Sequence, residues 1–542
     1  MSSAKEPVMR RFGNGLTVLI KEDKSHPVVS LQYWVGTGSM NEGHWQGSGL
    51  SHLLEHLVFK GTAHFSGQEL ARKVQERGGH WNAYTSVNRT VYYIDGPAES
   101  WQIFLNLLTE LVFFPTFPED EMEREKEVVR REMAMYADDP DSVAYQLLMQ
   151  TLYLKHPCRW PVLGERAAFD CLTRQDVLGY HASRYVPNNV VLSIAGDVDA
   201  AEILSHLELL VEDLKSRPLN REPIPHEPHQ FGSRRVRKEF AVPYSKLHLA
   251  WRLPCSAHPD TPALSALSSI LGGGRSARFY EKFHDRLGLV YSIEVHSNQS
   301  ETDEGAFTIS MDVDRAQRDK VRDLVLQELR NLAEEDFTED LKRVCKQTRV
   351  SRLRRRSSAS GVASEMGADW FGSRNLNLSS EWQEAIERVT TEDLHRVCST
   401  WLSSPNVTEV SLDPPGSNAG DEEMASASAG TSLSEHVLGN GMKVVIREDH
   451  RLPLAYACMA FKAGCRAENE HDAGVTDLMA ECLLKGTSTR SAADIARFLE
   501  DIGGAVNTST GNNSLSVGCQ VLAEDLDAGL ELMADVVMNP SF

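Results

Sequence analysis

The sequence predicts an α+β protein built from repeated domains, each with a mostly antiparallel β-sheet covered by helices. Three observations lead to this prediction. Short runs of β-forming residues, separated by tight turns, occur beside amphipathic helical stretches. Segments with few large apolar residues divide the chain into parts. The last part repeats the first in the order and spacing of its elements, which is the pattern of an internal repeat.

The N-terminal part supplies the clearest elements. A Gly-Asn-Gly turn precedes an apolar run at 16–20, and a second strand is expected at 28–35. A helix follows at 49–62, after a glycine-rich connection. The other expected elements are helices at 68–77, 101–113, 121–136 and 142–153, a hairpin of 81–86 with 90–94, and a strand within 190–197. Strands joined by such short connections pair antiparallel.

Length and composition divide the chain further. A chain of 542 residues is too long for one domain. The proline- and charge-rich stretch 216–228 marks one boundary, and 413–432 has almost no large apolar residue, as in a flexible linker. We therefore predict a first domain at 1–219, a second α+β domain at 220–412, a linker at 413–432, and a partial third domain at 433–542.

The charge balance excludes one class of function. The formal net charge is −21, whereas a nucleic-acid-binding protein needs a basic surface for phosphate contacts. The N-terminal residues carry charges and no apolar signal segment, and no run of about twenty apolar residues could cross a bilayer. The nine cysteines are scattered singly, without C-x-x-C pairs. We expect a cytoplasmic protein with no nucleic-acid or membrane partner.

The stretch 49–62 contains the motif His52-Leu53-Leu54-Glu55-His56. On a helix, residues three and four apart share a face, so the two imidazoles and the carboxylate point the same way. Two histidines at this spacing suit zinc, and a glutamate beside them can accept the proton of an attacking water. The alternative is that His52 and His56 are satisfied core histidines and Glu55 is a surface charge. A third ligand decides between these readings.

The helix expected at 121–136 supplies the candidate third ligand. Val128, Val129 and Tyr136 share a face with Glu125 and Glu132 by helical spacing. A carboxylate on an apolar stripe is costly unless it is paired or bound to a metal. Glu132 is therefore predicted to be the third metal ligand. The alternative is that the run of charges simply forms a solvated helix face.

Residues 474–487 repeat 49–62 without its chemistry. The copy places Asp477 at the position of His52, Ala480 at that of Glu55 and Glu481 at that of His56. The helix of the copy lacks these histidines, so they are not packing requirements of the repeat. The chain ends before a copy of the 121–136 helix begins, so we expect that it is a fragment of a longer protein.

Together these segments resemble the pitrilysin/insulinase family of zinc metallopeptidases, nearest the branch of the mitochondrial processing peptidase and its bacterial relatives. The resemblance implies one zinc ion per chain, held by His52, His56 and Glu132, with Glu55 as general base and Glu125 supporting the site. It further implies that the strand of residues 82–85 (Asn82, Ala83, Tyr84 and Thr85) binds the substrate as an added β-strand. The family's domains form the halves of a clamshell.

The resemblance leaves two functions open. The first is a zinc-dependent endopeptidase that hydrolyses peptides or unfolded protein segments within an enclosed chamber. The second is a catalytically silent scaffold or partner subunit, or an inactive fragment of a longer two-half peptidase. The remainder of a longer chain, or a second subunit, would complete the clamshell. The family's substrate-binding arginine and tyrosine are not assigned, because His284 stands at the arginine position before Tyr291.

Overall fold

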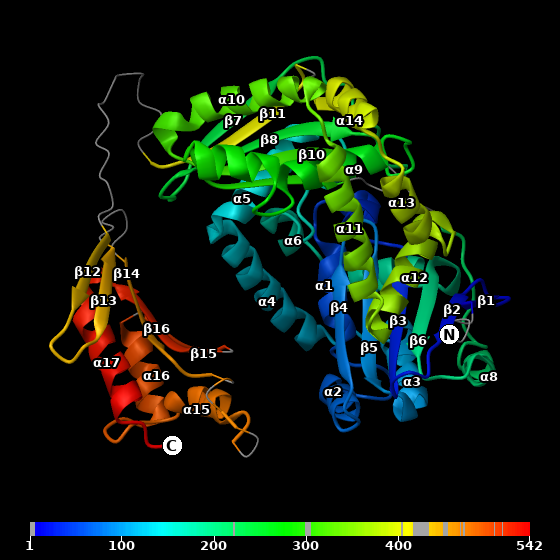
Figure 1. The fold of residues 1–542 in the computed structure, drawn as a ribbon. Coiled ribbons are helices and arrows are strands. Elements are labelled where there is room, and N and C mark those ends of the chain that lie inside the picture. Colours follow the sequence, from blue (N-terminus) through cyan, green and yellow to red (C-terminus); the bar gives the residue numbers. More distant parts are fainter. Residues whose placement is uncertain are drawn as a thin grey trace. The chain divides into compact units, whose positions relative to one another are not determined.

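The computed structural model describes residues 6–219, 223–298, 305–402, 405–415, 433–447, 454–464, 466, 468–469, 472–502, 504–511 and 513–542. The chain forms two compact units, 1–419 and 420–542, and each is described by itself (Figure 1). Most of the predicted linker, 416–432, lies outside the described residues, and Asp413, predicted to begin it, is instead the last residue of strand β11. The other predicted domain boundaries remain a prediction.

The first unit contains two mostly antiparallel sheets. The first sheet has the strand order β1-β2-β6-β3-β5-β4, and only β2 and β6 run parallel. Its strands are β1 (Val8–Arg11), β2 (Thr17–Glu22), β3 (Val28–Val35), β4 (His80–Thr85), β5 (Thr90–Pro97) and β6 (Val190–Gly196). One edge of this sheet is therefore β4. The second sheet has the order β7-β11-β8-β10-β9. Its strands are β7 (Arg234–Glu239), β8 (Ser245–Leu253), β9 (Val290–Asn298), β10 (Gly305–Val313) and β11 (Thr408–Asp413).

Helices cover both faces of each sheet, and one face in each case is covered by a helix from the other half of the unit. The first half contributes α1 (Leu50–Val58), α2 (Gly67–Gln75), α3 (Trp101–Phe113), α4 (Glu119–Asp138), α5 (Pro140–Leu152), α6 (Arg166–Asp170), α7 (Arg174–Arg184) and α8 (Ala200–Leu210). The second half contributes α9 (Thr261–Gly272), α10 (Arg318–Asn331), α11 (Thr338–Arg355), α12 (Ala359–Ser373), α13 (Leu378–Glu387) and α14 (Thr391–Val397). Helix α5 packs on β8 and β11 of the second sheet, and α12 packs on β3 and β6 of the first.

The packing of α5 on the second sheet and of α12 on the first sheet holds the two halves of the first unit together. Leu148 and Leu152 of α5 are buried against Val410 of β11, while Ala363 and Met366 of α12 are buried against Trp34 of β3. Burying apolar side chains across such contacts stabilises the arrangement by the hydrophobic effect. Helix α4 leads directly into α5, so its position over the first half is fixed at its C-terminal end.

The second unit repeats part of this plan. Its strands are β12 (Leu433–Val437), β13 (Lys443–Arg447), β14 (Leu454–Phe461), β15 (Ala505–Thr510) and β16 (Leu515–Leu522), and its helices are α15 (Val475–Leu483), α16 (Ala492–Asp501) and α17 (Leu526–Met538). β12 pairs with β13, and β14-β16-β15 form a three-stranded sheet. This is the order of the first sheet, except that the described residues of the unit contain no counterpart of β6.

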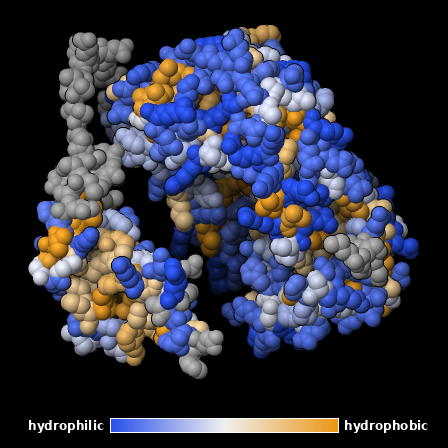
Figure 2. Space-filling model, in the orientation of Figure 1, coloured by the Kyte–Doolittle hydropathy of each residue, from blue (hydrophilic) through white to orange (hydrophobic). Residues whose placement is uncertain are grey.

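The predicted α+β class, with mostly antiparallel sheets covered by helices, is confirmed. The face of the first unit seen in Figure 2 is mostly hydrophilic, with apolar residues in small separate groups. Among the described residues, no helix combines the length and the apolar character needed to cross a membrane.

Candidate metal centre

Helix α1 holds the motif in a fixed rotation. Leu50, Leu53, Leu54 and Leu57 are fully buried, so the opposite face carries the motif side chains. The helix starts after Gly49, whose φ of 72° is left-handed. A Cβ there would lie 2.0 Å from a backbone oxygen, so both the conformation and the space require glycine.

The structure brings His52, His56 and Glu132 together. One ligand atom from each lies within 4.8 Å of the others, and this is the one such cluster found among the described residues. The Nε2 atoms of both histidines are 3.8 Å from Glu132 Oε2. That separation is too long for hydrogen bonds and is close to the roughly 3.3 Å between ligand atoms of a tetrahedral zinc ion. The donor set and its spacing fit zinc.

The protonation of His52 suits metal binding, whereas the pKa of His56 is shifted in the other direction. Burial, with a smaller contribution from the neighbouring His56, lowers the pKa of His52 to about 3, so this ring is neutral and can act as a ligand. Its Nδ1 is buried and has no hydrogen-bond partner in the described part of the chain, which argues against a satisfied core histidine. Burial lowers the pKa of His56 too, but the hydrogen bond with Glu125 and the nearby carboxylates outweigh it and raise this pKa.

Glu125 supports His56 from the neighbouring helix. Its Oε2 lies 3.1 Å from His56 Nδ1, and its Oε1 lies 2.6 Å from Lys60 Nζ. Burial would raise the pKa of Glu125, but the bonds to His56 and Lys60 lower it overall. The Lys60 contact was not predicted. Comparison of the two copies does not single out Lys60, because the second copy also has a lysine, Lys485, at the matching position.

Glu55 lies beside the cluster and is bound to β4. The Thr85 hydroxyl donates to Glu55 Oε2 at 2.5 Å, a contact that was not predicted. Burial raises the pKa of Glu55, partly offset by hydrogen bonds from the side chain and backbone of Thr85. Glu55 is therefore a carboxylate whose environment favours holding a proton, next to three metal-type ligands.

β4 presents its free edge on the same side as Glu55. The backbone N–H of Thr85 bonds to Glu55, and that of Ala83 donates to the side chain of Asn82 at 2.9 Å. Both N–H groups therefore point away from β5. Tyr84 and Asn82 are exposed on this strand. The predicted strand is thus an edge strand with backbone donors along the border of the site.

A cavity of about 670 Å³ opens at the cluster, with His52, Glu132 and Thr85 on its wall. Tyr136 and Tyr145 line it from α4 and α5, and Lys238 lines it from β7. Its size is within the range of ligand sites in proteins. Tyr145 and Lys238 were not predicted as site residues, because their approach depends on how α5 and β7 pack, and Tyr136 was predicted only as part of an apolar stripe.

The predicted apolar stripe of α4 is wrong. Val128 and Tyr136, predicted to share an apolar stripe with Glu132, are 45% and 51% exposed. The buried face of α4 consists of Met122, Glu125, Lys126 and Val129. Beyond Val129 the helix lies over the cavity instead of a core, so its side chains there are partly exposed.

The copy in the second unit keeps the scaffold. α15 also begins after a left-handed glycine, Gly474. Thr510, which corresponds to Thr85, donates to Asp477 at 2.7 Å. Asp477, Ala480 and Glu481 stand where the first copy has its motif residues, and no metal-type cluster occurs among the described residues of this unit.

Comparisons with known proteins agree with this fold. A family model described as insulinase, peptidase family M16, matches residues 17–166 and again 443–542. A second model, described as the peptidase M16 inactive domain, matches 172–347. These matches define a chain of the peptidase class, with both copies of the repeat matching one model. The chain belongs to peptidase family M16, the insulinase family, so the resemblance seen in the sequence is confirmed.

Curated relatives carry names in keeping with this family. An uncharacterized zinc protease of Rickettsia felis is 27% identical over 406 residues, which cover 73% of this chain and 94% of that one. The zinc protease PqqE of Helicobacter pylori is 26% identical over 411 residues, covering 74% and 91%. A crystal structure of a protease from Helicobacter pylori superposes with a TM-score of 0.69 at 26% identity, covering 76% of this chain and all of that one.

Proposed function

We propose that the chain is a zinc-dependent endopeptidase that hydrolyses peptides or unfolded protein segments, with one zinc ion held by His52, His56 and Glu132. The observation that carries the proposal is the convergence of these three donors, from two helices, beside Glu55, with His52 and Glu132 on the wall of one cavity. The names of the relatives support zinc and proteolysis.

A zinc ion at this cluster would polarise the scissile carbonyl and lower the pKa of water. Glu55 then accepts the proton of the attacking water and passes it to the leaving amine. Its raised pKa favours this role, because a base that must later act as an acid has to hold the proton between the two transfers. Glu125 keeps His56 oriented through the Nδ1 contact.

The substrate binds as an extra strand on the free edge of β4. The outward N–H groups of Ala83 and Thr85 are the backbone donors for such pairing. The Ala83 donor must first leave the Asn82 side chain, and the Thr85 donor must leave Glu55. A peptide placed there passes Glu55, since Thr85 lies on this edge strand and its hydroxyl donates to that carboxylate. Pairing through the backbone requires an extended, unfolded segment, which is why the proposed substrates are peptides and unfolded chains.

The test combines metal analysis with a fluorogenic peptide assay. Glu55→Gln should lower turnover by roughly 10²- to 10⁴-fold while the zinc content stays near one per chain. Glu132→Gln should lose both zinc and turnover. Glu123→Gln, on the exposed side of α4, is the matched control and should change neither. Undiminished turnover in Glu55→Gln would refute the role of Glu55.

A second candidate function is a silent scaffold, partner subunit or inactive fragment. Two observations favour it: the second unit carries the repeat without the motif residues, and residues 172–347 match a model described as an inactive domain. In that case a second subunit or further chain would complete the chamber. Zinc near one equivalent without cleavage of any peptide would favour this function over the peptidase.

A further inference from the structure

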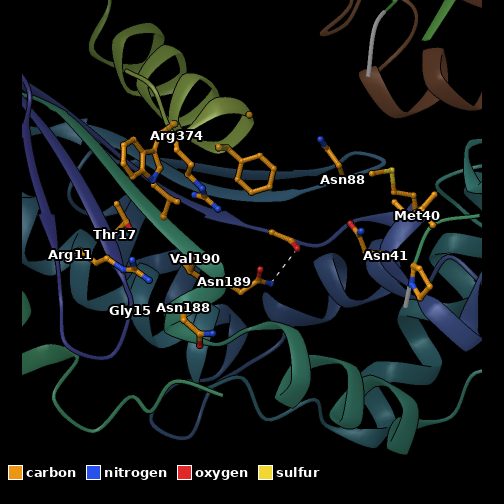
Figure 3. Close-up of a pocket in the computed structure, with 17 residues that line it drawn as sticks. Arg11, Gly15, Thr17, Met40, Asn41, Asn88, Asn188, Asn189, Val190 and Arg374 are labelled. Atoms are coloured by element: carbon orange, nitrogen blue, oxygen red, sulfur yellow. Dashed lines mark hydrogen bonds between the residues drawn. The ribbon is translucent and has the colours of Figure 1, made fainter. Parts of the chain in front are cut away.

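A second cavity, of about 610 Å³, lies where the C-terminal end of α12 meets β1, β2 and the start of β6 (Figure 3). It shares no lining residue with the cavity at the metal cluster. Its wall combines the first sheet, the segment at Pro223 and Ile224, and α12 from the other half of the first unit. A ligand here would therefore touch both halves at once.

The cavity is basic in an acidic protein. The chain has 77 acidic and 56 basic residues, yet the described residues lining this cavity include Arg11 and Arg374 and no aspartate or glutamate. In Figure 3, Arg374 extends from α12 into the cavity and Arg11 extends into it from the opposite side. Neither guanidinium has an ion pair or hydrogen bond with a side chain or backbone group in the described part of the chain. Two unpaired guanidinium groups facing one space favour an anion.

The backbone at Arg374 adds an independent observation. Its φ of 59° is left-handed, and among the described residues only Phe117 shares this property outside glycine. The position ends α12, where glycine is the usual residue because it has no Cβ to strain the conformation. A strained non-glycine residue at a cavity indicates that its side chain is used there.

The rest of the wall is suited to an apolar body. Met40, Val190, Trp370 and Phe371 line the cavity, and the indole Nε1 of Trp370 is a buried donor with no partner among the described residues. The volume lies within the range of small-molecule sites. The lining thus offers cationic groups, an unused N–H donor and aromatic surface.

We propose that this cavity binds a small organic anion, with a carboxylate or phosphate group between Arg11 and Arg374 and an apolar body against Trp370 and Phe371. Binding stabilises the first unit by mass action, because the unfolded chain lacks the site. The two anionic groups share one recognition chemistry, and the choice between them is made by the probes below.

The test is isothermal titration calorimetry of the full chain with phenyl phosphate and benzoate as organic anions, inorganic phosphate as the anion alone, and benzyl alcohol as the neutral body. We expect saturable binding of one organic anion or both, and weaker binding of inorganic phosphate and benzyl alcohol. Arg374→Gly and Arg11→Gln should each weaken binding roughly 10- to 100-fold, the usual range for losing a charge-assisted contact.

The variants separate binding from folding. Glycine suits the left-handed position, so Arg374→Gly should keep the melting temperature of the wild type or raise it. Arg10→Gln makes the same charge change on the neighbouring residue of β1, which does not line the cavity, and should bind as the wild type does. Equal binding by Arg10→Gln, Arg11→Gln and Arg374→Gly would overturn the proposal, as would the absence of saturable binding by every probe. Binding lost in Glu132→Gln but kept in Arg374→Gly would place the anion at the metal cluster and also overturn it.

Discussion

The buried carboxyl group of Glu42 allows a quantitative prediction about stability. Glu42 has no exposed surface. Its Oε1 accepts the backbone N–H of Ser51 at 2.8 Å, at the start of α1, and its Oε2 is buried without a hydrogen-bond partner in the described part of the chain. Burial raises the pKa of Glu42 to about 8 and outweighs the hydrogen bonding from Ser51, which lowers it.

The sign of the effect follows from comparing the folded and unfolded states. The unfolded chain releases this proton near the ordinary value of 4.5, whereas the folded chain keeps it until about pH 8. The contribution to stability is therefore fully present below pH 4.5 and is lost as the pH rises towards 8. The difference between the two pKa values corresponds to about 5 kcal/mol of unfolding free energy.

Glu42→Gln removes the titration and keeps an oxygen for Ser51. At pH 8.5 the variant should be more stable than the wild type by several kcal/mol, up to about 5, while at pH 5 the two should differ by about 1 kcal/mol. Urea unfolding followed by tryptophan fluorescence reports on the first unit alone, because all nine tryptophans lie at or before Trp401.

The second unit provides the matched control. Glu468 accepts the backbone N–H groups of Gly474 and Thr476 at the start of α15, and these bonds lower its pKa. Glu468→Gln should leave the tryptophan-detected transition unchanged at both pH values. A stability difference between Glu42→Gln and the wild type that is the same at pH 5 and pH 8.5 would refute the reasoning.

Two further predictions concern the metal centre and the strand edge. Glu125→Gln keeps the shape of a side chain that contacts His56 and Lys60 but removes its charge. Zinc affinity, measured by chelator competition, should therefore fall roughly 10- to 100-fold. An unchanged affinity would show that His56 needs no such support. Ala83→Pro removes one outward N–H from β4, so KM for a peptide should rise roughly tenfold with zinc content unchanged. A KM equal to that of the wild type would exclude strand pairing at this point.

Elements with a strong local pattern were predictable from the sequence. The strand expected at 28–35 and the helix expected at 101–113 have these bounds in the structure. Both segments are rich in apolar residues and are followed by turn or proline residues, so local signals fix their type and their length. The cluster of His52, His56 and Glu132 was also predicted, because the helical spacing of the motif fixes two of its members.

Contacts between distant segments could not be predicted in this way. Lys60 reaches Glu125 and Thr85 reaches Glu55 only because α4 and β4 pack beside α1. The same holds for Arg11 and Arg374, which are far apart in the sequence and meet at one cavity because α12 crosses to the first sheet. Periodicity within a segment carries no information about which other segment will cover it.

Glu132 lies with the two imidazoles, but not for the reason predicted from the sequence. The sequence argument placed it on a buried stripe, where an unpaired carboxylate would be too costly, yet its side chain is 30% exposed and its neighbour Tyr136 is more exposed still. The buried face of α4 ends at Val129, and one turn further the same face opens onto the cavity. The penalty for burial therefore does not force Glu132 to bind a metal; its distance from the two imidazoles is what supports that role. Because the Glu132 side chain is partly exposed, Glu132→Gln should change metal binding without a comparable loss of folding stability. The variant therefore tests the site separately from the fold.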